Sequence, residues 1–264
     1  MITFLKLGGS LITDKDQPST ARLDTINALV REIAHARETS ANLKLVIGHG
    51  SGSFGHIAGK IYGTRQGVKS EEGWQGFVEV WRQARALNQI IVEAFSAMNL
   101  PVIAFPPSAL IITRRGNQVQ WNTQPIRSAL QAGLIPLLNG DVVFDDEIGG
   151  TILSTEEVFT SLAESLPPNR ILLCGSEPGV WSDFPQCKTT VPNLTPSNAA
   201  KYFPTLKGSN SVDVTGGMLE KVRLMLNLVC EHPNLQAFIF SGKVPGNLSN
   251  ALKGQSVGTK ISAF

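Results

Sequence analysis

The chain lacks a charge bias, a cysteine framework and a long apolar run. Its formal net charge is +2 and only 17% of its residues are charged, too little for an electrostatic nucleic-acid binder. The three cysteines, Cys174, Cys187 and Cys230, show no C-x-x-C spacing, which favours reduced thiols over disulfides. No segment approaches the roughly 18 apolar residues of a membrane span, and no charged leader precedes the first strand. We therefore expect a cytoplasmic protein that binds neither nucleic acid nor membrane.

Strand-like and helix-like segments alternate along the 264 residues. Apolar residues at helical spacing predict helices at 20–38 and 72–98. Short apolar runs predict buried strands at 2–7, 43–47, 101–104, 134–138, 170–174, 236–241 and 258–262. This alternation predicts a mainly parallel sheet covered by helices on both faces.

Two segments interrupt the alternation. Residues 111–121 hold Arg114-Arg115-Gly116-Asn117 between apolar residues, and residues 141–153 turn at 145–150. Both patterns predict β-hairpins. We place a boundary near Pro167-Pro168. The N-terminal lobe, 1–167, would carry the hairpins, and the C-terminal lobe, 168–264, would complete one compact fold.

Three glycine-rich turns point to phosphate chemistry. They are Gly8-Gly9-Ser10 after the first strand, the stretch from Gly50 to His56, and Asp213-Val214-Thr215-Gly216-Gly217-Met218 at the start of a late helix. Backbone N–H groups in such turns can face an anion. None of the turns is a Walker A loop, and the G-x-G-x-x-G match at 50–55 is weak by itself. We therefore predict a protein that handles several phosphate groups at once.

Basic side chains accompany these turns. Lys6 ends a buried strand, where its charge is costly unless an anion meets it. His56 follows a turn shaped for an anion and could hold a phosphate there, whereas His49 is interpreted as structural. Lys15 and Lys221 have suitable spacing, but spacing alone also fits solvated lysines.

Together these residues resemble the amino acid kinase superfamily, and within it the isopentenyl phosphate kinases. The resemblance covers nearly the whole chain, through residues 6–15, Gly52-Ser53-Phe54-Gly55-His56, Asn139-Gly140-Asp141-Val142-Val143, Gly179-Val180-Trp181, 213–218 with Lys221, and Val257-Gly258-Thr259-Lys260-Ile261. It implies a three-layer αβα sandwich that binds the acceptor in the N-terminal lobe and the nucleotide in the C-terminal lobe. It further implies a homodimer and phosphorylation of isopentenyl phosphate to isopentenyl diphosphate by ATP with Mg²⁺, a reaction of isoprenoid biosynthesis.

The resemblance also implies roles for individual residues. The catalytic set would be Lys6, Lys15, His56 and Lys221. Nucleotide would be bound by Gly8, Gly9, Ser10, Gly179, Asp213, Gly216 and Gly217. The acceptor would be bound by His56 with Gly50, Ser51, Gly52, Gly55, Gly140 and Asp141. We expect no metal ion held by protein side chains.

Glu156 stands where the family often has an aspartate that orients the catalytic lysines. It is a candidate for that role, and it fits equally well a solvated glutamate favoured by the dipole at a helix start.

The hydrocarbon tail of the acceptor requires an apolar pocket. Phe77 and Trp81 lie on one face of the predicted helix 72–98 and are candidate walls, although such a stripe is also typical of core. Two other functions stay open. One is a kinase for another phosphate or phosphonate such as fosfomycin, and the other is a non-catalytic nucleotide-binding sensor or storage protein of the same fold.

Overall fold

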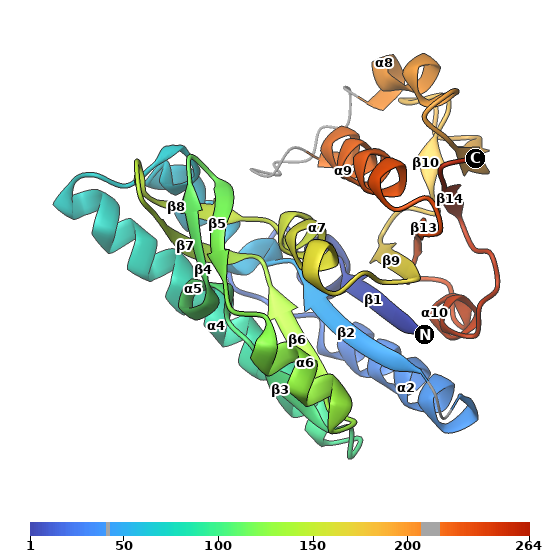
Figure 1. Ribbon diagram of the computed structural model, residues 1–264, viewed down its shortest axis with the longest axis horizontal. Helices are drawn as coiled ribbons and strands as arrows, with labels where there is room; N and C mark the ends of the chain where they lie inside the picture. The colour runs from blue at the N-terminus through green and yellow to red at the C-terminus, as the bar shows by residue number, and fades with distance from the viewer. Residues whose placement is uncertain (41–42, 207–216) are drawn as a thin grey trace.

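The computed structural model describes residues 1–40, 43–206 and 217–264 (Figure 1). Within these residues eight strands form one sheet, in the order β12-β14-β13-β9-β1-β2-β6-β3. Neighbouring strands are parallel except for the pair β13 and β14. The strands are β1 (Ile2–Leu7), β2 (Lys44–His49), β3 (Val102–Ala104), β6 (Ile135–Asn139), β9 (Arg170–Gly175), β12 (Asn193–Leu194), β13 (Gln236–Ser241) and β14 (Thr259–Ile261).

Helices cover both faces of this sheet. Successive residues of a strand point to opposite faces, so Phe4 and Leu5 of β1 belong to two different apolar clusters. The Phe4 cluster includes α6 (Gln124–Gln131), α7 (Thr155–Ser165) and α9 (Gly217–Glu231). The Leu5 cluster includes α2 (Leu23–Thr39), the second half of α4 (Glu71–Ser96) and α10 (Asn247–Leu252). The predicted αβα sandwich is confirmed.

A second sheet has the order β5-β4-β7-β8. It consists of β4 (Ile111–Arg114), β5 (Asn117–Trp121), β7 (Asp141–Asp145) and β8 (Gly149–Leu153). Both predicted hairpins are confirmed, and β4 and β7 join them in parallel. The shorter elements are α1 (Gly9–Ile12), η1 (Gly52–Phe54), α3 (His56–Ile61), η2 (Thr64–Gln66), α5 (Pro107–Leu110), β10 (Val180–Trp181), β11 (Thr190–Val191), η3 (Ala199–Tyr202) and α8 (Phe203–Leu206).

The predicted strands of the main sheet match the observed ones within two residues at each end. The helix predicted at 20–38 was wrong at its start, because it begins at Leu23. Ahead of it, Ala21 forms a β-bridge with Thr13, and Asp14 N donates a hydrogen bond to Thr20 O. These contacts hold residues 20–22 in an extended conformation against the loop after α1.

The topology brings the first two glycine-rich turns to one edge of the sheet. Strand β1 is flanked by β2 and β9, and the three run parallel, so their carboxyl ends coincide (Figure 1). Gly8 N donates to Cys174 O at 2.8 Å, and Gly50 N donates to Leu7 O at 3.1 Å. The chain leaves β1 for β2 over one face and reaches β9 from α7 on the other. In open α/β sheets ligands bind at such a switch point.

Asp145 joins the turns of the two hairpins. Its carboxylate accepts hydrogen bonds from Thr113 Oγ1 at 2.7 Å, from Gly116 N at 2.8 Å, and from the amides of Glu147 and Ile148 at 3.0 Å. Burial works against its charge, but these donors outweigh burial and hold the pKa of the Asp145 carboxyl well below its usual range.

We predict that Asp145→Asn lowers the free energy of unfolding by about 2 kcal/mol, because an amide cannot accept all four bonds. Because the folded-state pKa is depressed, the stabilisation is present above the unfolded pKa and is lost as pH falls through the folded value. Urea titrations at several pH values measure this. The exposed Asp146→Asn is the control, and equal effects of the two variants would contradict the prediction.

Candidate active site

The first two glycine-rich turns contact each other backbone to backbone. A Cβ on Gly9 would lie 2.4 Å from Gly52 N, and one on Gly50 would lie 2.9 Å from Gly9 N. The Gly52 φ of +53° is itself in the left-handed region. Thr13 links the turns, since its hydroxyl donates to Gly9 O at 2.8 Å and accepts from Ser53 N at 3.0 Å. Side chains at these glycines would push the turns apart.

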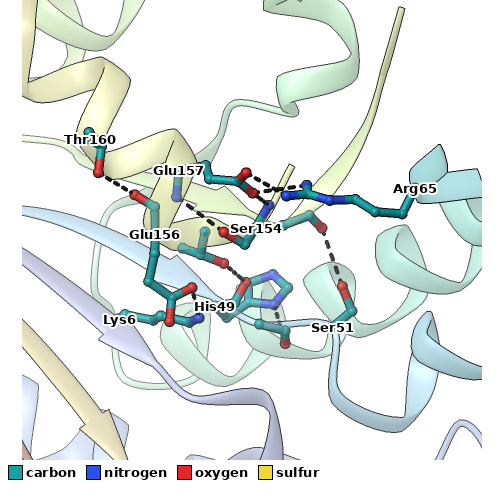
Figure 2. Close-up of polar contacts among 11 residues, drawn as sticks. Lys6, His49, Ser51, Arg65, Ser154, Glu156, Glu157 and Thr160 are labelled. Carbon is teal, nitrogen blue, oxygen red and sulfur yellow. Dashed lines mark hydrogen bonds and ion pairs between the residues drawn. The ribbon is translucent and has the colours of Figure 1, made fainter. Parts of the chain in front are cut away.

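Lys6 and Glu156 form an ion pair beside these turns (Figure 2). The side chains are 9% and 2% exposed, so both charges are buried. Burial opposes ionisation of Glu156. The charges of Lys6 and then Lys221 outweigh it, and the pKa of the Glu156 carboxyl is lowered. The structure therefore brings Lys6 from β1, Glu156 from α7 and Lys221 from α9 together, and Glu156 is not a solvated helix-start residue.

Helix α7 lies along β1 and presents Glu156 to Lys6. Residues i and i+2 of a strand share a face, as do i and i+3 of a helix. Phe4 stands two residues before Lys6, and Phe159 stands three residues after Glu156. The rings of Phe4 and Phe159 lie 5.1 Å apart. A Cβ on Gly48 of β2 would lie 2.5 Å from Thr155 Cγ2, so this glycine admits the helix close to the sheet. Within the described residues, Glu156 Oε1 has no hydrogen-bond partner.

His49 is buried between α4 and the second glycine-rich turn. Asn88 Nδ2 lies 3.0 Å from its Nε2, and its Nδ1 lies 3.3 Å from Gly50 O. With the amide donating, the proton sits on Nδ1 and is donated to Gly50 O. Burial, aided by the charge of Lys6, lowers the pKa of His49 to about 4 although the bond to Gly50 opposes this. A neutral, fixed imidazole supports the structural interpretation of His49.

His56 begins α3 and is half-buried. The turn before it reaches the end of β6, where the Ser51 hydroxyl donates to Gly140 O at 3.3 Å. Gly140 N donates to His49 O at 3.1 Å. The next residue, Asp141, is buried, and burial raises the pKa of its carboxyl to about 6, opposed by a hydrogen bond from Ser108 N. The predicted acceptor-binding residues around Ser51 and Gly140 therefore meet.

A pocket of about 130 Å³ lies beside Asp141. Its lining combines the polar side chains Arg85, Asn88, Asn139 and Asp141 with the apolar residues Trp81, Ala104 and Pro106. Phe77 does not line it. That side chain is 6% exposed and belongs to a small apolar cluster with Ala58, Val68, Val80, Val142 and Ile152. Of the two candidate walls of the tail pocket, Trp81 therefore lines the pocket beside Asp141, whereas Phe77 lies in the apolar cluster.

The remaining predicted residues have the following surroundings, or lie outside the described residues. Lys15 is exposed in the loop after α1. Gly179 packs against β14, where an added Cβ would lie 2.6 Å from Thr259 Oγ1. Gly8 contacts the end of β9, and Ser10 O accepts a hydrogen bond from Ser176 Oγ at 3.2 Å. Gly217 opens α9 with a φ of +65°. Asp213 and Gly216 lie outside the described residues.

The described residues contain neither a cluster of metal ligands nor a helix that could span a membrane. Across residues 1–40, 43–206 and 217–264, no group of three or more His, Cys, Asp or Glu side chains could hold a metal ion. In the same ranges, the longest apolar stretches of helix fall short of what a membrane crossing requires.

Sequence reasoning missed the contacts that fix the start of α7. Ser154 caps the helix in a capping box with Glu157, and Thr155 Oγ1 donates to His49 O at 2.7 Å. Arg65 pairs with Glu157. The Ser-Thr-Glu-Glu sequence signals the capping box. The partners of Thr155 and Glu157 are 106 and 92 residues away, and no local pattern indicates them.

Comparisons with known proteins identify the family of this chain. Residues 1–241 match the amino acid kinase family. The chain belongs to that family and shares the fold of a solved member.

Within the family the chain groups with the isopentenyl phosphate kinases. It is 32% identical to the enzyme of Methanocaldococcus jannaschii, covering 99% of this chain and 98% of that one. It is 32% identical to the enzyme of Methanothermobacter thermautotrophicus, covering 98% of both. A solved structure of isopentenyl phosphate kinase superposes with a TM-score of 0.83 at 28% identity, covering 99% of this chain and all of that one.

We predict that Glu156→Gln lowers kcat by about 10- to 100-fold, because Lys6 loses the partner that orients it. Removing one member of a buried pair should also lower the free energy of unfolding by about 3 kcal/mol. Steady-state kinetics and urea unfolding measure the two effects. Glu164→Gln, an exposed position on the same helix, is the control. Unchanged kcat in Glu156→Gln would remove Glu156 from the mechanism.

Proposed function

We propose that this protein is an ATP-dependent kinase that phosphorylates isopentenyl phosphate to isopentenyl diphosphate, in isoprenoid biosynthesis. The observation that carries the proposal is the gathering of Lys6, Glu156 and Lys221 beside two turns of main-chain amides. Full-length similarity to isopentenyl phosphate kinases supports it.

The chemistry fits these residues. A phosphate monoester is already an anionic nucleophile, so the reaction needs no strong general base. The obstacle is the repulsion between two polyanions, which cations and amides overcome by positioning and charge compensation. In the proposal Lys6, Lys15 and Lys221 neutralise the ATP phosphates and the transferred phosphoryl group. His56 and the amides from Gly50 to Gly55 hold the acceptor phosphate.

We propose that the nucleotide arrives as MgATP, with the metal held by its phosphates. Residues 168–264 form the nucleotide lobe, in which Gly179, Asp213, Gly216 and Gly217 face the nucleotide together with the turn from Gly8 to Ser10. Residues 1–167 form the acceptor lobe. The hydrocarbon tail lies along the apolar cluster next to α3, because Ala58 of that cluster is two residues from His56. Phe77 is a wall of this space, and Trp81 follows it one turn later on α4.

We further propose a cytoplasmic homodimer. Strand β3 is the last strand of the main sheet, and Ile103 on it is 40% exposed. An open edge with an exposed apolar residue favours pairing with another chain. Sedimentation equilibrium at micromolar concentration tests the dimer, and a monomer there would contradict it.

A second candidate acceptor is a small polar phosphate or phosphonate such as fosfomycin. The polar side chains in the pocket beside Asp141 favour it, because Arg85, Asn88 and Asn139 can form hydrogen bonds with a polar ligand and not with a hydrocarbon tail. ATP consumption measured in parallel with isopentenyl phosphate, dimethylallyl phosphate and fosfomycin separates the candidates. Turnover with none of them would favour a non-catalytic nucleotide-binding protein.

We predict that His56→Ala lowers kcat/KM for isopentenyl phosphate by about 100-fold or more, because the acceptor phosphate loses a donor at the reacting centre. ATP binding, followed by calorimetry with a non-hydrolysable analogue, should stay within about twofold because His56 faces the other ligand. His35→Ala, on the exposed side of α2, is the control. Normal turnover in His56→Ala would exclude His56 from the mechanism.

We predict that Phe77→Ala and Trp81→Ala shift the acceptor preference toward longer prenyl phosphates, since each enlarges the space beside the tail. Phe77→Ala should in addition cost about 3 kcal/mol of stability because its ring is buried. The measurement is kcat/KM across a series of prenyl phosphates, with the exposed Val78→Ala as control. An unaltered chain-length profile would exclude both residues from the tail pocket.

A further inference from the structure

We infer that Arg65, in the short helix η2 after α3, is a positioning residue that holds Glu156 in register with Lys6 by fastening the first turn of α7. The inference rests on the proposed function for its kinetic consequence, and on the hydrogen bonds of Arg65 for its geometry. Arg65 touches neither Lys6 nor Glu156 directly in these contacts, and acts through the neighbouring Glu157.

The guanidinium of Arg65 spans the junction between β8 and α7 (Figure 2). Its Nη1 donates to Ile152 O near the end of the strand and to Glu157 Oε2 at 3.0 Å, and its Nη2 donates to Glu157 Oε1 at 2.5 Å. Such a two-pronged contact fixes orientation as well as distance. The residues between Ile152 and Glu157 are therefore held at both ends by one side chain.

Glu157 passes this constraint to the helix backbone. Its Oε2 also accepts from Ser154 N at 2.7 Å, and its own amide donates to Ser154 Oγ at 3.2 Å. On the other side of Glu156, Thr155 Oγ1 donates to His49 O at the end of β2. Both neighbours of Glu156 are thus fixed. Thr155 is bound to the sheet through His49 O, and Glu157 is bound to Arg65.

The contacts of Arg65 join the segment of His56 to the segment of Glu156. Helix η2 follows α3, which begins at His56, and Thr151 Oγ1 of β8 donates to Arg65 O at 2.9 Å. Both the main chain and the side chain of Arg65 therefore bind the β8–α7 strand-to-helix connection. A displacement of η2 would therefore move His56, the proposed ligand of the acceptor phosphate, relative to the Lys6–Glu156 pair.

The side chains of Arg65 and Glu157 are 29% and 27% exposed. Ion pairs this accessible contribute little to global stability. Transfer geometry is far more sensitive, because a displacement of about 1 Å at the reacting centre can cost about 100-fold in rate. A positioning role therefore predicts a large kinetic effect with a small effect on unfolding.

Arg65→Ala tests this. We expect kcat to fall by about 10- to 100-fold and KM for the acceptor to rise, with KM for MgATP within about twofold. Arg65→Lys keeps the charge but cannot span both Ile152 O and Glu157, so it should restore kcat only in part. Arg82→Ala is the matched control, since Arg82 forms a two-pronged pair with Glu79 within α4. Equal kcat losses in Arg65→Ala and Arg82→Ala would overturn the inference.

Two further measurements separate positioning from simple destabilisation. In the Glu156→Gln background, where no ion pair remains to be positioned, Arg65→Ala should change kcat by less than about twofold. The same loss in both backgrounds would overturn the inference. Amide hydrogen exchange at residues 154–158 should become faster in Arg65→Ala and stay unchanged in Arg82→Ala, and unchanged exchange in both would also overturn it.

Amide hydrogen exchange is measured without turnover, so it tests whether Arg65 fixes the start of α7 even if isopentenyl phosphate is not a substrate. Lack of turnover by the unaltered protein with isopentenyl phosphate would instead refute the proposed function. In that case the kcat values of the Arg65 and Arg82 variants are compared with whichever acceptor supports ATP consumption in the parallel assay.

Discussion

The buried ion pair of Lys6 and Glu156 is the interaction on which the site depends. Taking two charges out of water costs several kcal/mol per ion, so such a pair is a weak source of stability. Its physical value lies elsewhere. A lysine held by a carboxylate before a ligand arrives needs no reorganisation when charge moves past it. The charges of Lys6 and then Lys221 hold the pKa of this carboxyl below its usual value despite its burial.

The αβα topology makes this pair possible. Lys6 lies between Leu5 and Leu7, which point to the opposite face of the sheet and pack in the cluster of α2 and α10. Lys6 shares the other face with Phe4, and α7 covers that face with Phe159 and Glu156 in line. The absence of a side chain at Gly48 lets α7 approach. An apolar contact and a charged contact are thus set by one helix packed along one strand.

Local patterns predict both hairpins, the first two glycine-rich turns and the strands of three or more residues, because each depends on residues close in sequence, but they do not predict the two-residue strands β10, β11 and β12. Lys6 can be singled out for the same reason, as a charge at the end of an apolar run. The burial of Glu156 cannot be predicted, since an acidic residue in the first turn of a helix is ordinarily solvated and its partner is 150 residues away. Phe77 and Trp81 share a helical stripe, yet only Phe77 is covered, because the hairpin sheet and α3 reach one end of α4.

The two histidines of the second turn differ in what surrounds them. His49 is buried beside Lys6, with a pKa near 4, and stays neutral at physiological pH, so it fixes Gly50 without adding a second cation there. His56, seven positions later, is half-buried at a helix start. Asp141, with a pKa raised to about 6, changes charge just below neutrality in the lining of the pocket. Between pH 5 and 7 Asp141 therefore changes its charge, while His49 beside Lys6 keeps the same protonation state.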